Sequence, residues 1–454
     1  MTKNIPVTVG QVCTVKIESM GESGEGVGRY QGFTLFIPQA LPGEDVTATV
    51  TAVKKNYALG RLQGIITAAP GRVEPPCPHY PRCGGCQLQH LSYPEQLKVK
   101  RQKVKDALRH IGGLPNVPVL PVLGGEPWHY RNKMQFPVGK TQGKIVLGCF
   151  AAGSHQIIDT PACLIQQEYN NELATVMRRL IAELKITVYN EDKHTGLLRH
   201  VMGRVGSDGE LMAVLVTATE KFPQAKMLVK KLREALPQLA SVQQNIQTYH
   251  NNVILGRETK LLWGKPTISD RLGDLRFNIS PRSFFQVNTA QATTLYGQVL
   301  AYANLHGREE VIDAYCGTGT ITLFLAAKAG RVYGTEIVST AVQDAKKNAR
   351  DNRLKNVEFL LGDAKHLLPT LQKKGLRADV IVTDPPRAGC DAAVLTAFAQ
   401  MHPRRIVYVS CNPATLARDL KILQGLGYQT KEVQPVDMFP QTTHVECVAL
   451  LTRD

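Results

Sequence analysis

The chain has 454 residues and carries 54 Lys and Arg against 38 Asp and Glu, a formal net charge of +16. At roughly 150 residues per domain, this length predicts about three domains and excludes a single small module. The positive charge favours a polyanionic partner, with nucleic acid ahead of anionic lipid. No apolar run approaches the roughly 18 residues of a membrane span, and the start "MTKNIPVTVGQ" lacks the apolar core of a signal peptide. We therefore expect a cytoplasmic protein that does not contact membranes.

Residues 5–64 consist of short runs of alternating apolar and polar residues punctuated by Gly and Pro, which predicts a small antiparallel barrel of about five strands. The segment "GESGEGVGR" lies between strands, so a hairpin loop is favoured over a phosphate cradle. This barrel resembles a TRAM domain, an RNA-binding module of the OB-like type. Barrels of that kind bind RNA through basic and aromatic side chains, although a solubilising surface is the alternative. The candidates are Tyr30, Lys54, Lys55, Tyr57 and Arg61.

A proline-rich hinge leads into the cysteine cluster "CPHYPRCGGCQLQH", in which Cys77, Cys83 and Cys86 follow a C-x5-C-x2-C spacing. The reducing cytoplasm favours metal ligation or burial over disulfides. Three thiolates need a fourth ligand, and the downstream candidates are Cys149 and Cys163. Cys149 lies in an apolar strand run, so Cys163, which follows a turn, is favoured. Zinc and an iron–sulfur cluster both suit four thiolates, and a set of structural thiols is the third interpretation.

The middle of the chain mixes strands and helices, which predicts an α+β domain. Strands are expected at residues 144–150, 211–218 and 253–256, and amphipathic helices near 168–184 and 223–235. Before them, "WHYRNKMQF" (Trp128 to Phe136) interleaves Arg131 and Lys133 with aromatic residues. This composition suits phosphate contact with base stacking, and an amphipathic strand with an aromatic core face is an equal alternative.

In the last third of the chain, strands alternate regularly with helices, which predicts a parallel sheet covered on both faces. In "DAYCGTGTIT" a strand runs into Gly317 and Gly319, and a helix follows. The next three strands each end in an acid: Glu336, Asp363 and Asp384. Three acids at strand ends favour the cationic S-adenosylmethionine over NAD, because it carries no pyrophosphate for them to repel. N-caps of the following helices are the alternative role for these acids.

"YVSCNPATLARDL" places Cys411 at the end of a strand, one strand after "DPPR". A thiol facing a methyl donor suits methylation of pyrimidine carbon 5, in which a thiolate adds to carbon 6 and a base later removes the carbon 5 proton. Because a thiol has a pKa of about 8.5, its site must activate it, with help from the start of the following helix. A buried filler is the alternative. His444 and Glu446 are competing candidates for the base, while Cys447 points to the opposite face and is expected in the core.

Five motifs taken together resemble the RNA uridine-5 methyltransferases, the TrmA/RumA-like family: "SFFQVN", "DAYCGTGT", "DPPRAG", "YVSCNPATLARDL" and "FPQTTHVE". The resemblance implies that Cys411 is the nucleophile and Glu446 the proton-abstracting base. It also implies a pocket for S-adenosylmethionine and uracil and a [4Fe-4S] cluster with a role in folding or RNA placement. The implied pocket residues are Gln286, Tyr315, Glu336, Asp363 and Asp384, and the implied cluster ligands are Cys77, Cys83, Cys86 and Cys163.

The resemblance implies a multidomain α/β protein. Its expected parts are a TRAM-like barrel at 5–64, a central α+β domain with the iron–sulfur site at 65–270, and a Rossmann-like class I methyltransferase domain at 271–454. The basic helix at 94–112 is expected to pack with the catalytic domain. The expected substrate is 23S ribosomal RNA, because TRAM and the cluster are more similar to the ribosomal RNA branch, and transfer RNA is the alternative. A monomer without an obligate protein partner is expected.

Two other classes compete with this interpretation. An amino-group methyltransferase would use the Asp-Pro-Pro motif and would not need Cys411, and a non-catalytic RNA-binding iron–sulfur protein would transfer no methyl group. In the favoured reaction the target uridine must leave the RNA stack, and Phe284 or Phe285 is expected to lie against it.

Overall fold

The computed structural model describes residues 5–453. Residues 1–4, the first part of the start examined for a signal peptide, and residue 454 lie outside the described residues. The chain forms two compact units: residues up to 100 with 150–156 and 439–443, and residues 101–149, 157–438 and 444 onward. Among the helices of residues 5–453, none is long and apolar enough to cross a membrane.

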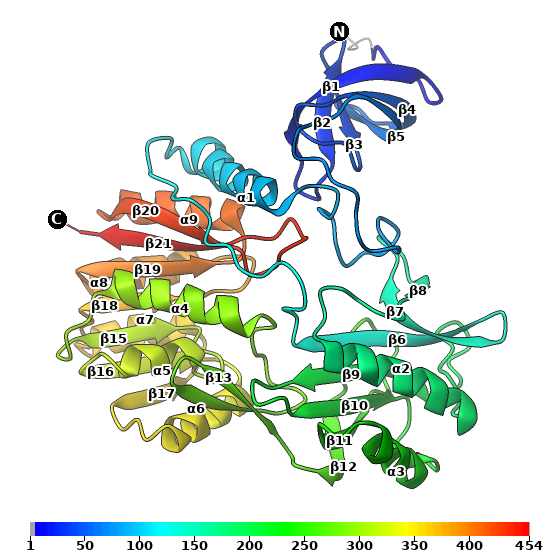
Figure 1. Cartoon of the computed structure of the whole chain (residues 1–454). Helices are drawn as coiled ribbons and strands as arrows, with labels where there is room; N and C mark the ends of the chain where they lie inside the picture. The colour runs from blue at the N-terminus through cyan, green and yellow to red at the C-terminus, as the bar shows by residue number, and fades with distance from the viewer. Residues whose placement is uncertain (1–4, 454) are drawn as a thin grey trace. The chain divides into compact units, whose positions relative to one another are not determined.

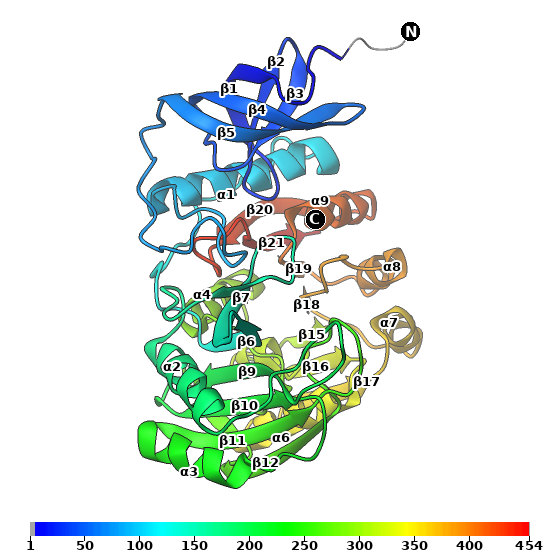
Figure 2. The same ribbon diagram turned by 90° about the vertical axis from the view of Figure 1, so that its right-hand side faces the viewer.

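The first unit contains the predicted barrel, which closes in the order β1-β2-β3-β5-β4 (Figure 2). Alternate residues of β1 and β4 are buried inside it, as a strand period of two requires. Four pairings are antiparallel as expected, but β3 and β5 run parallel. At Gly28 a Cβ would lie 2.4 Å from the Lys16 carbonyl oxygen, so only glycine permits the β1–β2 hairpin to close there. The strands are β1 (Val12–Met20), β2 (Gly26–Tyr30), β3 (Phe33–Ile37), β4 (Asp45–Val53) and β5 (Tyr57–Thr67).

A buried ion pair between Glu44 and Arg72 holds the segment after β5 against the barrel. Glu44 is fully buried and accepts hydrogen bonds from Arg72 Nε at 2.5 Å and Nη2 at 2.8 Å. Its carboxylate also accepts the backbone N–H groups of Leu41 and Ala69. Because all these donors converge on one carboxylate, the charge is compensated and the pKa of Glu44 is lowered despite its burial.

The second unit contains a central seven-stranded sheet in the order β12-β11-β10-β9-β6-β7-β8. Helices α2 (Glu168–Glu183) and α3 (Ala225–Ala235) lie at the predicted positions and pack along it (Figure 1). Residues 253–256, predicted as a strand, form a loop. The strands are β6 (Lys133–Thr141), β7 (Lys144–Phe150), β8 (Ile157–Asp159), β9 (Leu198–Val205), β10 (Leu211–Thr217), β11 (Leu239–Ile246) and β12 (Glu258–Gly264), and a separate hairpin has β13 (Ile268–Leu272) and β14 (Leu275–Ile279).

The same unit contains a second seven-stranded sheet in the order β17-β16-β15-β18-β19-β21-β20 (Figure 1). Five strands are parallel as predicted, but β21 runs antiparallel to both of its neighbours, β19 and β20. The strands are β15 (Glu310–Ala314), β16 (Arg331–Glu336), β17 (Val357–Leu361), β18 (Val380–Thr383), β19 (Arg405–Ser410), β20 (Gln429–Val436) and β21 (Glu446–Thr452). The helices are α4 (Thr289–Ala303), α5 (Thr320–Ala326), α6 (Ser339–Asp351), α7 (Ala364–Lys373), α8 (Ala392–Gln400) and α9 (Pro413–Gly425).

Helix α1 (Tyr93–Ala107) continues into a π-helical turn, Leu108–Gly112, and contributes to the core of this second sheet. Val104 and Leu108 are buried in the same apolar cluster as strands β18, β19 and β21. Cys447 is fully buried in that cluster, which confirms its expected place in the core. The early basic segment therefore helps to build the fold that carries the candidate site.

Candidate active site

The candidate site lies at the carboxyl edge of the five parallel strands. Strand order reverses between β15 and β18, and ligands of open α/β sheets bind in the crevice at such a point. Five of the predicted side chains come within two residues of the end of their strands, so the sheet brings them to one edge. In the order β17, β16, β15, β18 and β19 they are Asp363, Glu336, Tyr315, Asp384 and Cys411.

The turn after β15 has a backbone conformation that allows it to approach the crevice closely. Gly317 and Gly319 have φ of +55° and +84°, and Tyr315 adopts +64° although it has a side chain. A positive φ at a tyrosine is strained, and such strain gathers at ligand sites. At Gly319 a Cβ would lie 3.2 Å from the Phe359 ring, which is a tight contact, and the φ of +84° further disfavours any side chain there.

The acids at the ends of β16 and β17 accept hydrogen bonds from backbone amides. Glu336 accepts hydrogen bonds from Gly317 N at 3.1 Å and Val338 N at 2.7 Å, which connects it to the glycine turn. Asp363 caps α7 by accepting from Lys365 N at 2.9 Å, so the N-cap role holds for this residue. Each carboxylate has about four acceptor positions, so both retain capacity for a ligand.

Pairing between β19 and β21 brings Cys411 and Glu446 together. Ser410 and Cys447 are opposite one another in this antiparallel pair, and the two candidates are the next residues along each strand. Cys411 is half-buried and Glu446 is 7% exposed. His444, the competing base, is exposed and precedes β21. The register therefore places the carboxylate beside the thiol.

Burial and mutual repulsion raise the pKa of each acidic group here. Burial raises the pKa of Glu446 to about 8, with a further contribution from Asp384, while Arg387 lowers it. Burial, Glu446 and Asp384 raise the pKa of Cys411 to about 11, again opposed by Arg387. Burial alone raises the pKa of Asp384 to about 6. Arg387 and a backbone hydrogen bond only partly offset this rise, so the thiol of Cys411 is protonated at neutral pH in the ligand-free site.

Sequence reasoning missed Tyr296 of α4, which lies beneath the site. Its side chain is 2% exposed, and its hydroxyl hydrogen-bonds Thr320 Oγ1 at 3.3 Å and the side chain of Gln286. Burial raises its pKa, and so do the charges of Asp384 and Glu446. Because Tyr296 occupies an apolar helix position, nothing in the sequence distinguishes it from core. Its hydroxyl therefore connects Gln286 by hydrogen bonds to Thr320 at the start of α5, near the carboxyl edge of the sheet.

Arg387 is the second residue for which sequence reasoning gave no role. It follows β18 in the loop "DPPR" and is exposed. The loop is held at its backbone, because Thr415 Oγ1 and Asn412 Nδ2 donate to the Arg387 carbonyl at 3.2 and 3.3 Å. Its guanidinium opposes the pKa rise of Cys411 and Glu446, so it favours their anionic forms.

A buried network fixes this loop against α9. Asp419 is fully buried and accepts from Tyr408 Oη at 2.5 Å and from Cys390 N at 2.8 Å. Arg418 Nε donates to the other oxygen of Asp419 at 2.8 Å, and Arg418 Nη2 donates to the Ala388 carbonyl at 2.8 Å. The loop that carries Arg387 and the helix that follows Cys411 are thereby joined.

The aromatic candidates differ in accessibility. Phe284 is 75% exposed, whereas Phe285 is 5% exposed and contacts Phe277. Phe284 is therefore the one available to a base. In "WHYRNKMQF", Phe136 is buried in the core under α2, which agrees with an aromatic core face on this strand. On the barrel, four of the five candidates are exposed, and Tyr30 packs partly against the barrel core; the exposed ones are Lys54, Lys55, Tyr57 and Arg61.

The structure does not show the expected metal centre among the described residues, and its candidate ligands are divided between the two compact units. Cys77, Cys83 and Cys86 are half-buried in one loop, where Cys83 forms a β-bridge with Ala151. Cysteine thiolates are chemically suitable ligands for iron or zinc. Within residues 5–453, however, no three His, Cys, Asp or Glu side chains are placed to hold a metal ion. Cys163 packs against the core of the central sheet. The structure therefore does not support a cluster.

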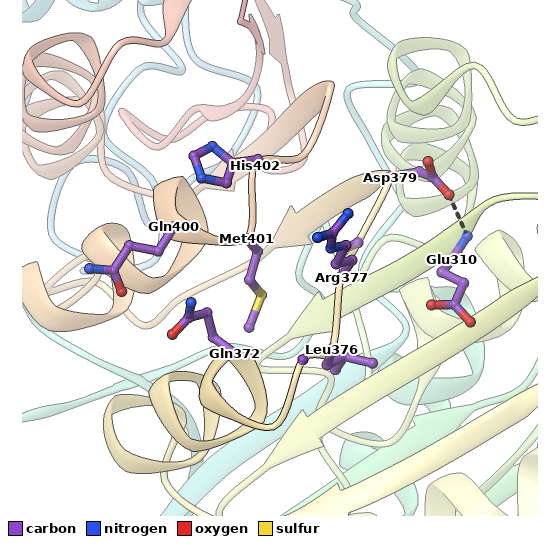
Figure 3. Close-up of a pocket in the computed structure, with 10 residues that line it drawn as sticks. Glu310, Gln372, Leu376, Arg377, Asp379, Gln400, Met401 and His402 are labelled. Atoms are coloured by element: carbon purple, nitrogen blue, oxygen red, sulfur yellow. Dashed lines mark hydrogen bonds between the residues drawn. The ribbon is translucent and has the colours of Figure 1, made fainter.

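A cavity of about 530 Å³ lies at the opposite edge of the catalytic sheet (Figure 3). It is lined by Glu310 at the start of β15 and by Asp379 and His402, which precede β18 and β19. The carboxylate of Asp379 accepts the Glu310 N–H at 3.0 Å. None of the predicted site residues lines this cavity, and ligands of such sheets bind at the carboxyl ends. It is not the candidate site.

Fold and site together define a class I S-adenosylmethionine-dependent methyltransferase with an N-terminal TRAM barrel. Residues 6–62 match the family model described as TRAM domain, and residues 92–454 match the one described as tRNA (Uracil-5-)-methyltransferase. The chain therefore belongs to the tRNA (uracil-5-)-methyltransferase family. It is an enzyme.

Relatives and a solved structure resemble the chain over almost its whole length. An uncharacterized RNA methyltransferase of Halalkalibacterium halodurans is 52% identical, covering 98% of both chains. One from Clostridium tetani is 50% identical, covering 100% of this chain and 98% of the other. The crystal structure of Pyrococcus abyssi tRNA (uracil-54, C5)-methyltransferase with S-adenosyl-L-homocysteine has a TM-score of 0.78 and 29% identity, covering 97% of this chain and 99% of that one.

Proposed function

We propose that this enzyme methylates carbon 5 of a uridine in RNA, with Cys411 as nucleophile and Glu446 as base. The observation that carries the proposal is the β19–β21 register, which places the thiol beside a 7% exposed carboxylate at the carboxyl edge of the sheet. An amino-group methyltransferase would need neither residue. A non-catalytic binding protein would have no reason to bury an acid beside a thiol.

The sulfur of Cys411, as thiolate, adds to carbon 6 of the uracil, and carbon 5 of the resulting enolate attacks the donor's methyl group. S-adenosylhomocysteine leaves with the electron pair of the broken sulfur–methyl bond. The Glu446 carboxylate then removes the proton from carbon 5, and the carbon 6–sulfur bond breaks to restore the double bond. A pKa of about 8 makes this carboxylate a stronger base than an exposed glutamate.

The methyl donor is proposed to lie along the acids of the carboxyl edge. Glu336 would accept hydrogen bonds from ribose hydroxyls, Asp363 would lie near the adenine, and Tyr315, Asp384 and Gln286 would line the rest of the pocket with the uracil. Asp384 raises the pKa values of both Cys411 and Glu446, so a cationic sulfonium beside it would lower them. The donor's charge thus favours the thiolate that the reaction needs.

The proposed substrate is 23S ribosomal RNA, supported by the similarity of the TRAM-containing organisation to the ribosomal RNA branch. Transfer RNA is the second candidate, and a specific observation favours it. The Pyrococcus abyssi tRNA (uracil-54, C5)-methyltransferase covers 97% of this chain, so a chain of this length does not distinguish between the two substrates. The Trp128–Phe136 segment and the exposed barrel residues are proposed RNA contacts.

The proposed [4Fe-4S] cluster on Cys77, Cys83, Cys86 and Cys163 rests on the cysteine spacing and on the family resemblance. No step of the proposed reaction passes through it.

The test of the function is transfer of a labelled methyl group to 23S ribosomal RNA and to tRNA that lack 5-methyluridine. We expect labelled 5-methyluridine in one of them with the native enzyme, and at least about a thousandfold less with Cys411→Ala. Cys447→Ala serves as the matched control, because its thiol lies in the core beside the site. Full activity of Cys411→Ala would exclude the covalent route, and absence of transfer to either RNA by the native enzyme would overturn the proposal.

A further inference from the structure

Two cations lie side by side on the face of the central sheet that α2 and α3 do not cover. Lys133 of β6 and Arg204 of β9 are direct cross-strand neighbours, so their side chains share a face. The adjacent residues Met134 and Val205 belong to the apolar core under the helices, which assigns the cations to the other face. Arg204 Nη2 donates to the Ser283 carbonyl at 2.6 Å, so this face meets the segment "SFFQVN".

The charge of this cluster is poorly compensated. Arg204 is 4% exposed, and its Nε has no hydrogen-bond partner although it is buried. Burial, Arg204 and Arg131 together lower the pKa of Lys133 to about 7. None of the ion pairs among the described residues includes any of these three cations. Asp270 favours the charged form of Arg204 from a distance.

Among the described residues, Asp270 acts on Arg204 through its charge and not through a hydrogen bond or an ion pair. Its two oxygens accept from Arg271 N at 2.8 Å and Thr289 Oγ1 at 3.1 Å. Burying cations without a bonded anion is unfavourable, and a bound anion would compensate their charge. Lys133 and Arg131 are half-buried, so an anion can reach them, while Arg204 forms the floor.

We propose that Lys133, Arg131 and Arg204 bind one phosphodiester group of the RNA strand that carries the target uridine. The inference rests on the proposed function for the identity of the strand. Guanidinium and ammonium groups are the side chains that bind phosphate through charge-assisted hydrogen bonds, and the unpaired Arg204 Nε is a donor still available for one. Arg204 contacts Ser283, and the exposed Phe284, which is expected to lie against the flipped uridine, is the next residue. We therefore expect the bound phosphate to lie next to the flipped nucleotide.

The test compares RNA binding by Lys133→Met, which keeps the length of the side chain, with Lys140→Met, an exposed lysine of the same strand. Affinities for a 23S ribosomal RNA transcript and for tRNA are measured by fluorescence anisotropy over a range of KCl concentrations. For the RNA that binds more tightly, we expect Lys133→Met to weaken binding about tenfold and to reduce the salt slope by about 0.7 to 0.9. Lys133→Arg should restore most of the loss.

The control Lys140→Met should change affinity less than about twofold. Equal effects of the two Met variants, or an unchanged slope in Lys133→Met, would overturn the site. Titration with inorganic phosphate separates a free-phosphate site from a strand site: Lys133-dependent phosphate binding with unchanged RNA affinity would overturn the strand assignment. Failure of methyl transfer would refute the proposed reaction alone, because these binding measurements do not require turnover.

Discussion

At the scale of the residue, the site is defined by acids whose charged forms are disfavoured. Residue types at strand ends allowed Asp384 and Cys411 to be predicted from the sequence, with His444 and Glu446 as competing bases. Their pKa values were not predictable, because they depend on burial and on the distances that the β19–β21 register sets. The choice between His444 and Glu446 stayed even on the residues alone, since only the fold shows that one is exposed and the other buried.

The raised pKa of Glu446 predicts a pH-dependent stability. Its pKa is about 8 in the folded protein against an ordinary value of 4.5. Between these pH values Glu446 holds a proton in the folded state but not in the unfolded state. The stability that Glu446 contributes in its protonated form is therefore lost as pH rises through about 8. Glutamine cannot ionise. We therefore expect the Tm of Glu446→Gln to exceed that of the native enzyme by roughly 2 to 6 °C at pH 9, with a much smaller gap at pH 5.

Differential scanning calorimetry at both pH values measures this gap. Glu234→Gln is the control, because its side chain is 61% exposed and pairs only loosely with Lys230 at 4.0 Å. The control should show the same Tm difference from the native protein at both pH values. A Glu446→Gln gap that does not grow with pH would refute the assignment of a buried, protonated carboxyl group.

At the scale of the element, regular alternation predicted most strands and helices, and the exceptions have physical causes. Residues 253–256 have strand-like composition, but side-chain amides take the backbone groups that a partner strand would use. Asn245 accepts the Gly256 N–H at 2.7 Å, and Gln247 Nε2 donates to the Val253 carbonyl at 2.6 Å. Tyr296 was missed for a similar reason, because contacts made by tertiary packing give it a role that its apolar helix position conceals.

The Asp419 network predicts that the "DPPR" loop and α9 act as one positioned unit. Asp419→Asn weakens the acceptance of hydrogen bonds from Tyr408, Cys390 and Arg418, and we expect a loss of roughly 1 to 3 kcal/mol in the free energy of unfolding. Since Arg387 then lies less firmly beside Cys411, the thiol should become harder to ionise. At pH 8 the variant should therefore be alkylated at Cys411 by iodoacetamide more slowly than the native enzyme. Its alkylation rate should increase with pH only at a higher pH than in the native enzyme.

The matched control for this variant is Asp379→Asn at the opposite edge of the sheet, which removes a charge partner of Arg404 at 3.2 Å. It should lower stability without changing the alkylation profile of Cys411. Identical alkylation profiles for Asp419→Asn and the native enzyme would show that the network supports only the fold.

At the scale of the whole molecule, composition predicted a basic protein of several parts, and the family match with the TRAM barrel agrees with an RNA substrate. The metal centre is where sequence and structure diverge. The cysteine spacing predicts thiolate ligation, yet the described side chains do not gather around a metal position. Ligand spacing along a chain does not fix where loops place their thiols when binding of the metal itself shapes the loop.

Metal analysis of protein purified without oxygen tests the spacing argument. We expect about four iron and four sulfide per chain, with broad absorbance near 400 nm that is lost in Cys83→Ser. Cys149→Ser is the control, because this alternative fourth ligand packs against the central core. A content of one zinc per chain would indicate a zinc site instead of an iron–sulfur cluster. The absence of both metals would refute metal ligation by these cysteines.

The central claim is that the sulfur of Cys411 bonds to the uracil and that Glu446 releases it. Glu446→Gln keeps the shape of the site but lacks the base, so turnover should fall about a hundredfold to ten-thousandfold while the methylated adduct accumulates. Mass spectrometry of the digested complex should find a 5-methyluridine nucleotide attached to the peptide containing Cys411, and none in Glu446→Gln/Cys411→Ser. Normal turnover by Glu446→Gln without any adduct, or an adduct on another residue, would contradict the account.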